Sequence, residues 1–325
     1  MVRFGLGAAL FIVAAGVHAC AGYGPSGNIP IHNEDVIVIW DDRLQSQTFI
    51  RRASFTTEES RMAFIVPVPS RPRLFPVDDR LFSEVATVTG LHGLRRIPAS
   101  ADGMLAAGGG GGGTERVRVV ESQVVAGYRA VTLQATSAAV LVNYLRERKF
   151  PVTSGTQEWL QPYIDRDFYL VALDLTAPQR GTHLKLPALG MTFTTPRPFY
   201  PWREPTSPKN TRSAGFRDWN AWVISRKHLT LGVTNLTKPS DRFQHRTFNG
   251  TRKRLSYWPS SVPQFDSWVA NAYTWHYEKP RADHDLVWLP QDNTRNLDDL
   301  IDGLQINWAL PAPHGPSRPE NREIL

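Results

Sequence analysis

The stretch RVRVVESQVVAGYRAVTLQATSAAVLVNYLRERK, residues 116–149, decides the fold class because two strand patterns are followed directly by a helix pattern. Residues 116–125 and 128–134 are rich in Val and other strand-forming residues, which predicts two strands. Residues 136–149 begin with a Thr-Ser cap, carry apolar residues at helical spacing and end with cations that complement the helix dipole. This unit predicts an α+β protein.

The same patterns recur on both sides of this stretch. Strand patterns occupy residues 36–40, 47–55, 62–68, 168–173, 183–195, 267–277 and 285–289, and short helix patterns occupy residues 79–88, 156–164 and 296–304. We therefore expect mainly antiparallel sheets with a few short helices. A change in composition near residue 200 predicts two lobes, an α+β lobe over 22–200 and a basic, Trp-rich, β-rich lobe over 201–310.

Length and composition describe a soluble globular protein: the chain has 325 residues, of which 41% are hydrophobic and 21% are charged. A chain of this length buries enough surface to fold without a metal or a disulfide. The one cysteine, Cys20, cannot form an internal disulfide, so cysteine content does not indicate the compartment. The location must be argued from the N-terminus.

Residues 1–21 have the pattern of an export signal. Arg3 precedes an uncharged run over residues 4–17, about 14 residues or roughly 21 Å as a helix, which is short for the ~30 Å hydrocarbon core of a bilayer. Three outcomes stay open: cleavage after Ala21, lipidation of Cys20 in a sequence that approximates a lipobox, or retention as an N-terminal membrane anchor. All three predict a periplasmic protein on the outer side of the cytoplasmic membrane.

Residues 103–113 are glycine-rich, with six consecutive glycines at 108–113. A phosphate-binding loop would need a flanking strand and helix together with a Lys-Ser/Thr pair, which this segment lacks. The composition is instead typical of a flexible linker. We therefore expect a loop that divides a hairpin or a subdomain.

Several motifs in combination resemble a known family. They are Phe64-Ile65-Val66-Pro67-Val68-Pro69, Asp79-Arg80-Leu81-Phe82, the segment 141–162, the strand 168–173 and Asp283-His284-Asp285-Leu286-Val287-Trp288. Together they are similar to the DUF2330 family of exported bacterial proteins of unknown function. The resemblance implies an exported address and no particular reaction. Such proteins often carry paired cysteines after the leader, whereas Cys20 stands alone, so a disulfide-linked N-terminus is not expected.

Residues 203–254 carry the basic excess of the chain. They hold 12 Lys or Arg residues against 3 acidic residues, a net charge of +9 compared with +7 for the whole chain, and eight of the ten tryptophans follow residue 200. Arg and Trp are enriched at interface hot spots, and Trp also favours the membrane–water boundary. The opposing interpretation is that the arginines are scattered over a solvated surface while the tryptophans fill the core.

We expect this basic aromatic face to dock on a membrane protein complex or an anionic membrane surface. The candidate docking residues are Trp202, Arg203, Arg212, Arg217, Trp219, Trp222, Arg252, Lys253, Arg254 and Trp258. Nucleic acid is not an expected partner, because an exported protein does not meet it and no nucleic-acid-binding module is visible.

The sequence assigns no residue to catalysis, to a cofactor, to a small-molecule substrate or to a metal. His276 and His284 lie near acidic residues, but their spacing matches no helix-borne pair of metal ligands. A Ser-His-Asp triad would be assembled only in space, and the chain shows no nucleophile-elbow signature.

These observations predict a non-enzymatic extracytoplasmic binding or scaffold protein, for example an extrinsic subunit that stabilises a respiratory or photosynthetic complex of the cytoplasmic membrane. Residues 311–325 contain four prolines and predict an extended tail, which either lies across a partner or frays in solvent. The alternative is a hydrolase acting on a cell-envelope polymer. A concave pocket with perturbed acidic or His side chains would favour the hydrolase, and a flat basic face would favour docking.

Overall fold

The fold is seen in a computed structural model, which describes residues 22–24, 27–29, 31–57, 61–91, 117–150, 152, 155–176, 182–203, 217–231, 242–251, 254–277 and 285–290. Four predicted features lie outside these residues: the signal segment 1–21, the glycine-rich loop 103–113, the helix at 296–304 and the tail 311–325. No helix in the described ranges is long and apolar enough to cross a membrane.

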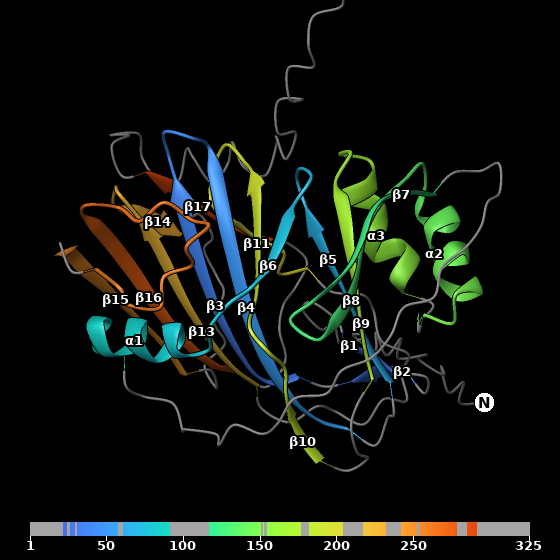
Figure 1. Cartoon of the computed structure of the whole chain (residues 1–325), viewed down its shortest axis with the longest axis horizontal. Coiled ribbons are helices and arrows are strands. Elements are labelled where there is room, and N and C mark those ends of the chain that lie inside the picture. Colours follow the sequence, from blue (N-terminus) through green and yellow to red (C-terminus); the bar gives the residue numbers. More distant parts are fainter. Residues whose placement is uncertain are drawn as a thin grey trace, which may run out of the picture.

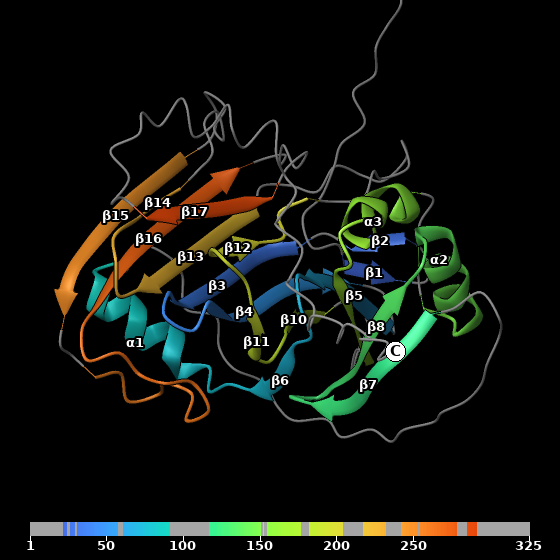
Figure 2. The same cartoon turned by 90° about the horizontal axis from the view of Figure 1, so that it is seen from above.

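Two large sheets form the body of the protein (Figures 1 and 2). The eight-stranded sheet has the order β15 (Arg242–Thr251), β16 (Trp268–Tyr277), β13 (Arg217–Ser225), β3 (Ile31–Asp41), β4 (Ser46–Thr57), β11 (Leu189–Thr194) and β6 (Arg73–Pro76), with β10 (Thr182–Lys185) paired to β4. The six-stranded sheet has the order β2 (Gly27–Ile29), β1 (Gly22–Gly24), β5 (Arg61–Val68), β9 (Tyr169–Thr176), β8 (Tyr128–Ala135) and β7 (Val117–Val125). A small sheet has the order β12 (Phe199–Tyr200), β17 (Leu286–Pro290) and β14 (Leu229–Leu231).

The central strands are buried on both faces, which explains their continuous apolar runs. In β5, Phe64 and Val66 belong to the core between the two large sheets, whereas Ala63 and Ile65 belong to a second core on the other face of the six-stranded sheet. Because successive side chains of a strand point to opposite faces, one apolar segment closes two cores.

Three short helices cover the outer faces of the sheets. Helix α1 (Arg80–Thr89) packs on the eight-stranded sheet, while α2 (Ala138–Glu147) and α3 (Thr156–Ile164) pack on the six-stranded sheet (Figures 1 and 2). The predicted cap of α2 is confirmed, since the Ser137 side chain accepts a hydrogen bond from the backbone N–H of Val140. The expectation of mainly antiparallel sheets with a few short helices is confirmed for the described residues, although strands dominate more than the α+β label suggests.

The predicted division into lobes at residue 200 does not match the sheets. Strands β13, β15 and β16 follow residue 200, yet they share one sheet with β3 and β4. Strand β13 pairs in parallel with β3, from Asp218 opposite Asn33 to Ser225 opposite Trp40. The composition changes near residue 200, but hydrogen bonds between distant segments decide which strands form a sheet.

Candidate functional site

Three of the predicted docking residues are buried. The exposed fractions of Trp202, Trp219 and Trp222 are 0%, 1% and 4%. Trp202 stacks on Trp275 with ring centroids 5.4 Å apart, and Trp219 meets Trp202 edge-on at 5.1 Å. The prediction that these three side chains contact a partner is therefore wrong. Their rings remove large apolar areas from water and stabilise the core.

The remaining docking candidates have several environments. Arg254 is exposed, Arg203 is half-buried, and Trp258 is half-buried with its indole N–H donating to the carbonyl of Val262 over 2.9 Å. Arg217 lies in β13, and its side chain is not among those described. Cys20, Arg212, Arg252 and Lys253 lie outside the described residues.

The structure describes only half of the weak metal-site candidate. Nδ1 of His276 lies 2.6 Å from Oδ1 of Asp218, its neighbour across β13 and β16, and His284 lies outside the described residues. Within the described ranges, no three His, Cys, Asp or Glu side chains are grouped closely enough to hold a metal ion. His276 therefore acts as a cross-strand partner of Asp218.

Asp285 is a buried acidic residue, 2% exposed, whose environment sequence reasoning missed. Its carboxyl group accepts hydrogen bonds from the Tyr163 hydroxyl over 2.7 Å and from the backbone N–H of Arg203 over 3.1 Å. Burial raises the pKa of Asp285 above its ordinary value, while these bonds and the charges of Arg203 and Arg166 oppose the rise. A perturbed acid can mark a catalytic site. Here the group is enclosed by the fold, so it fastens β17 to α3.

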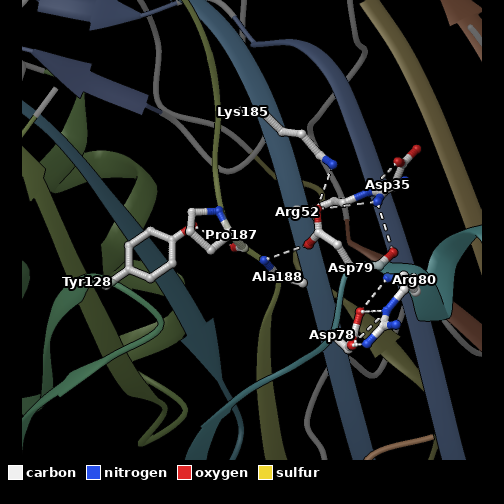
Figure 3. Close-up of polar contacts among 9 residues, drawn as sticks. All are labelled: Asp35, Arg52, Asp78, Asp79, Arg80, Tyr128, Lys185, Pro187 and Ala188. Atoms are coloured by element: carbon white, nitrogen blue, oxygen red, sulfur yellow. Dashed lines mark hydrogen bonds and ion pairs between the residues drawn. The ribbon is translucent and has the colours of Figure 1, made fainter. Parts of the chain in front are cut away.

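A charged cluster joins β3, β4, β10 and the start of α1 (Figure 3). Nε of Arg52 donates to Asp35 over 2.7 Å, and Nζ of Lys185 lies 2.6 Å from Oδ2 of Asp79. Nη1 of Arg52 also lies 3.6 Å from Oδ2 of Asp79, so Arg52 links the Asp35 pair to the Lys185–Asp79 pair. Because each of these charges has a partner of opposite sign, the cluster holds α1 on the sheet.

A different arrangement occurs where three turns meet, which we call the basic end. The basic end consists of the β3–β4 turn, the segment after β11 and the β13–β14 turn, residues 41–46, 194–198 and 225–229. Nη1 and Nη2 of Arg226 lie 2.5 and 3.0 Å from the two carboxylate oxygens of Asp41. The backbone N–H of Thr195 donates to the carbonyl of Gln45 over 2.7 Å. These contacts hold the turns together at the upper edge of the sandwich in Figure 1.

Cations exceed acids at the basic end. Its three segments contain four Lys or Arg residues and two Asp residues, a net charge of +2. Arg226 pairs with Asp41, and Lys227 lies 3.4 Å from Asp42. The two remaining cations, Arg43 and Arg197, form no ion pair with any residue that the structure describes.

Arg197 combines partial burial with this lack of an acidic partner among the described residues. Burial lowers the pKa of its guanidinium from the ordinary value, since the charged form loses hydration without gaining a carboxylate. The backbone around it is fixed: Pro196 and Pro198 flank it, and the Thr195 hydroxyl donates to its carbonyl over 2.7 Å. A planar guanidinium that projects from an ordered turn can bind a carboxylate or a phosphate through two parallel hydrogen bonds.

Comparisons with known proteins place the chain in a family. No curated protein matches it. Among solved structures, the crystal structure of baculovirus P35 is aligned over 81% of this chain and 97% of that chain, at 10% identity and a TM-score of 0.39, a likeness too weak to indicate a shared fold. The family DUF2330, described as an uncharacterized protein conserved in bacteria, matches residues 14–215, which cover more than half of the sequence. The chain is therefore a member of the DUF2330 family.

Proposed function

We propose that the protein is a non-enzymatic binding or scaffold protein on the outer side of the cytoplasmic membrane, where it serves as an extrinsic subunit of a membrane protein complex. The observation that carries this proposal is the basic end, where Arg43 and Arg197 lack acidic partners among the described residues. Cations that no described acidic residue neutralises are available to an anionic partner.

The other prominent polar and aromatic groups have roles within the fold, which supports the same proposal. The tryptophan cluster around Trp202 fills the core, and the charged cluster around Arg52 is neutralised within the fold. Asp285, a buried acidic group with a raised pKa, accepts hydrogen bonds from Tyr163 of α3 and from the backbone N–H of Arg203. The basic end thus differs from these groups, since two of its cations have no acidic partner in the part of the chain that the structure describes.

The proposed location is supported by the sequence of residues 1–21, where an uncharged run precedes the small residues Ala19, Cys20 and Ala21. Cleavage, lipidation of Cys20 and retention remain three forms of one proposal, because each leaves residues 22–325 outside the cytoplasm. The mass of the N-terminal peptide distinguishes them.

The test uses the full chain, tagged at its C-terminus and expressed in its own bacterium. Protease added to spheroplasts should degrade the chain while a cytoplasmic control protein survives. Gentle-detergent extraction should then recover the chain in stoichiometric amounts with subunits of one membrane complex. Protection from protease would refute the location, and a chain recovered as a soluble monomer would refute the scaffold role.

A further inference from the structure

We propose that the basic end is a docking site for an acidic segment of a partner protein, in which Arg197 binds one carboxylate and Leu44 contacts an apolar neighbour of that carboxylate. This inference rests on the proposed function and names the surface that performs it. The proposed contact residues lie on two turns that the sequence did not single out. The buried tryptophans Trp202, Trp219 and Trp222 are not among them.

Leu44 supplies the apolar part of the site. Its exposed fraction is 61%, and the other two large hydrophobic residues exposed in the described ranges, Val119 and Val124, lie on β7 in the other sheet. The backbone around Leu44 is held, because its N–H donates to Oδ1 of Asp41 over 3.3 Å and Gln45 adopts a left-handed conformation with φ 45°. Covering this exposed apolar side chain with a partner removes it from water and therefore favours binding.

The position of Arg197 supplies the charged part. Gln47 forms two hydrogen bonds with the backbone of Phe199, over 2.6 and 2.7 Å, and the backbone N–H of Trp288 donates to the carbonyl of Pro198 over 3.2 Å. These bonds lie directly after Arg197 and fasten its turn to β4 and β17. Because the turn is already ordered, binding does not pay for ordering the backbone, so more of the interaction energy appears as affinity.

The turns of Leu44 and Arg197 are directly connected, since the backbone N–H of Thr195 donates to the carbonyl of Gln45 over 2.7 Å. A half-buried arginine and an exposed leucine thus lie on two turns whose backbones are hydrogen-bonded to each other. This combination of a charged anchor and apolar contact fits one carboxylate in a protein segment.

An anionic membrane surface fits less well. Adsorption to lipid headgroups uses several fully exposed cations, each contributing about 1 kcal/mol near the surface. At the basic end, Arg226 and Lys227 are paired with Asp41 and Asp42 and Arg197 is half-buried, which leaves Arg43 as the exposed cation without an ion pair to any described residue. One exposed unpaired cation and one half-buried arginine suit a single anionic group better than a layer of headgroups.

The test places benzoylphenylalanine, a photoreactive amino acid, at position 44 of the full chain in its own bacterium, with a matched chain carrying it at Val119. Illumination should cross-link position 44 to a membrane protein, at a segment containing Asp or Glu, while position 119 should give no such product. Arg197→Glu should abolish the cross-link. Arg118→Glu should not, because Arg118 is an exposed arginine on β7, in the other large sheet and outside the three segments of the basic end.

A charge exchange completes the test. Arg197→Glu should weaken binding of the purified partner about tenfold or more, and Arg replacing the cross-linked acidic residue of that partner should restore it. Two results would overturn the proposal in favour of a membrane surface. One is a cross-link from position 44 to lipid, and the other is binding to phosphatidylglycerol vesicles that Arg118→Glu and Arg197→Glu weaken equally. If the chain co-purifies with the complex but position 44 gives no cross-link, this docking site is wrong and the proposed function stands. If the chain neither co-purifies nor cross-links, the proposed function is wrong as well.

Discussion

The hydroxyl of Tyr163 donates a hydrogen bond to the carboxyl group of Asp285 over 2.7 Å and joins α3 to β17, although the two residues lie 122 positions apart in the sequence. Both side chains are buried. Tyr163→Phe removes the donor and leaves the buried acid with fewer partners, so the free energy of unfolding should fall by about 1–3 kcal/mol. Urea denaturation measures this, and an unchanged midpoint would show that the bond is dispensable.

Asp285 should make stability depend on pH. Its pKa is raised in the folded protein, so the folded state binds the proton more strongly than the unfolded state does. The acid therefore costs stability progressively as pH rises from its unfolded pKa of about 3.9 towards the raised folded value. Asp285→Asn cannot ionise, so its stability relative to the wild type should increase through this window and then stay constant. Urea midpoints at a series of pH values test this, and a constant difference would contradict the account.

Asp41 should act in the opposite direction. Burial raises the pKa of Asp41, but hydrogen bonds from the Arg226 side chain and from the backbone N–H groups of Leu44 and Arg43 outweigh it and lower the pKa below the ordinary value. An acid whose pKa is lowered by folding stabilises the fold above its unfolded pKa of about 3.9. This contribution is lost as pH falls through the folded pKa. Arg226→Gln should therefore move acid unfolding to higher pH. Circular dichroism during acid titration measures the midpoint, with Arg118→Gln as a control that should not move it.

Gly190 is required for close packing between β11 and β6. A Cβ atom at position 190 would overlap the ring of Phe75, its cross-strand partner. Gly190→Ala should destabilise the protein by about 1–3 kcal/mol. The second change Phe75→Leu should restore part of the loss, because the smaller side chain makes room for the methyl group. Thermal unfolding of the single and double variants tests the coupling, and additive losses would argue against a direct clash.

Local features could be predicted from the sequence, because local physics produces them. Ser137 caps α2 since a hydroxyl can reach the backbone N–H three residues ahead, and the apolar run of β5 is long enough to be buried on both faces. The pairing of β13 with β3 could not be predicted, because its register joins Asp218 to Asn33 and neither strand carries a local sign of its partner.

The candidate site was harder to predict for the same reason. Trp219 and Trp222 looked like docking residues because tryptophan is common both in cores and at interfaces, and only the sheet arrangement shows which applies. Asp35 and Arg52 become an expected pair once β3 and β4 are aligned, since they are register partners. Arg197 belongs to no periodic sequence pattern. Its significance appears only in the structure, where Arg226 and Lys227 have acidic partners and Arg197 has none among the described residues.

The most direct test of the central claim compares folding and docking in Arg197→Met. If Arg197 serves a partner, the variant should keep or gain thermal stability, because an incompletely hydrated charge is removed from the fold, and it should lose co-purification with the membrane complex. If Arg197 serves the fold, the variant should unfold at a lower temperature and still co-purify when it is kept cold. That second result would contradict the account.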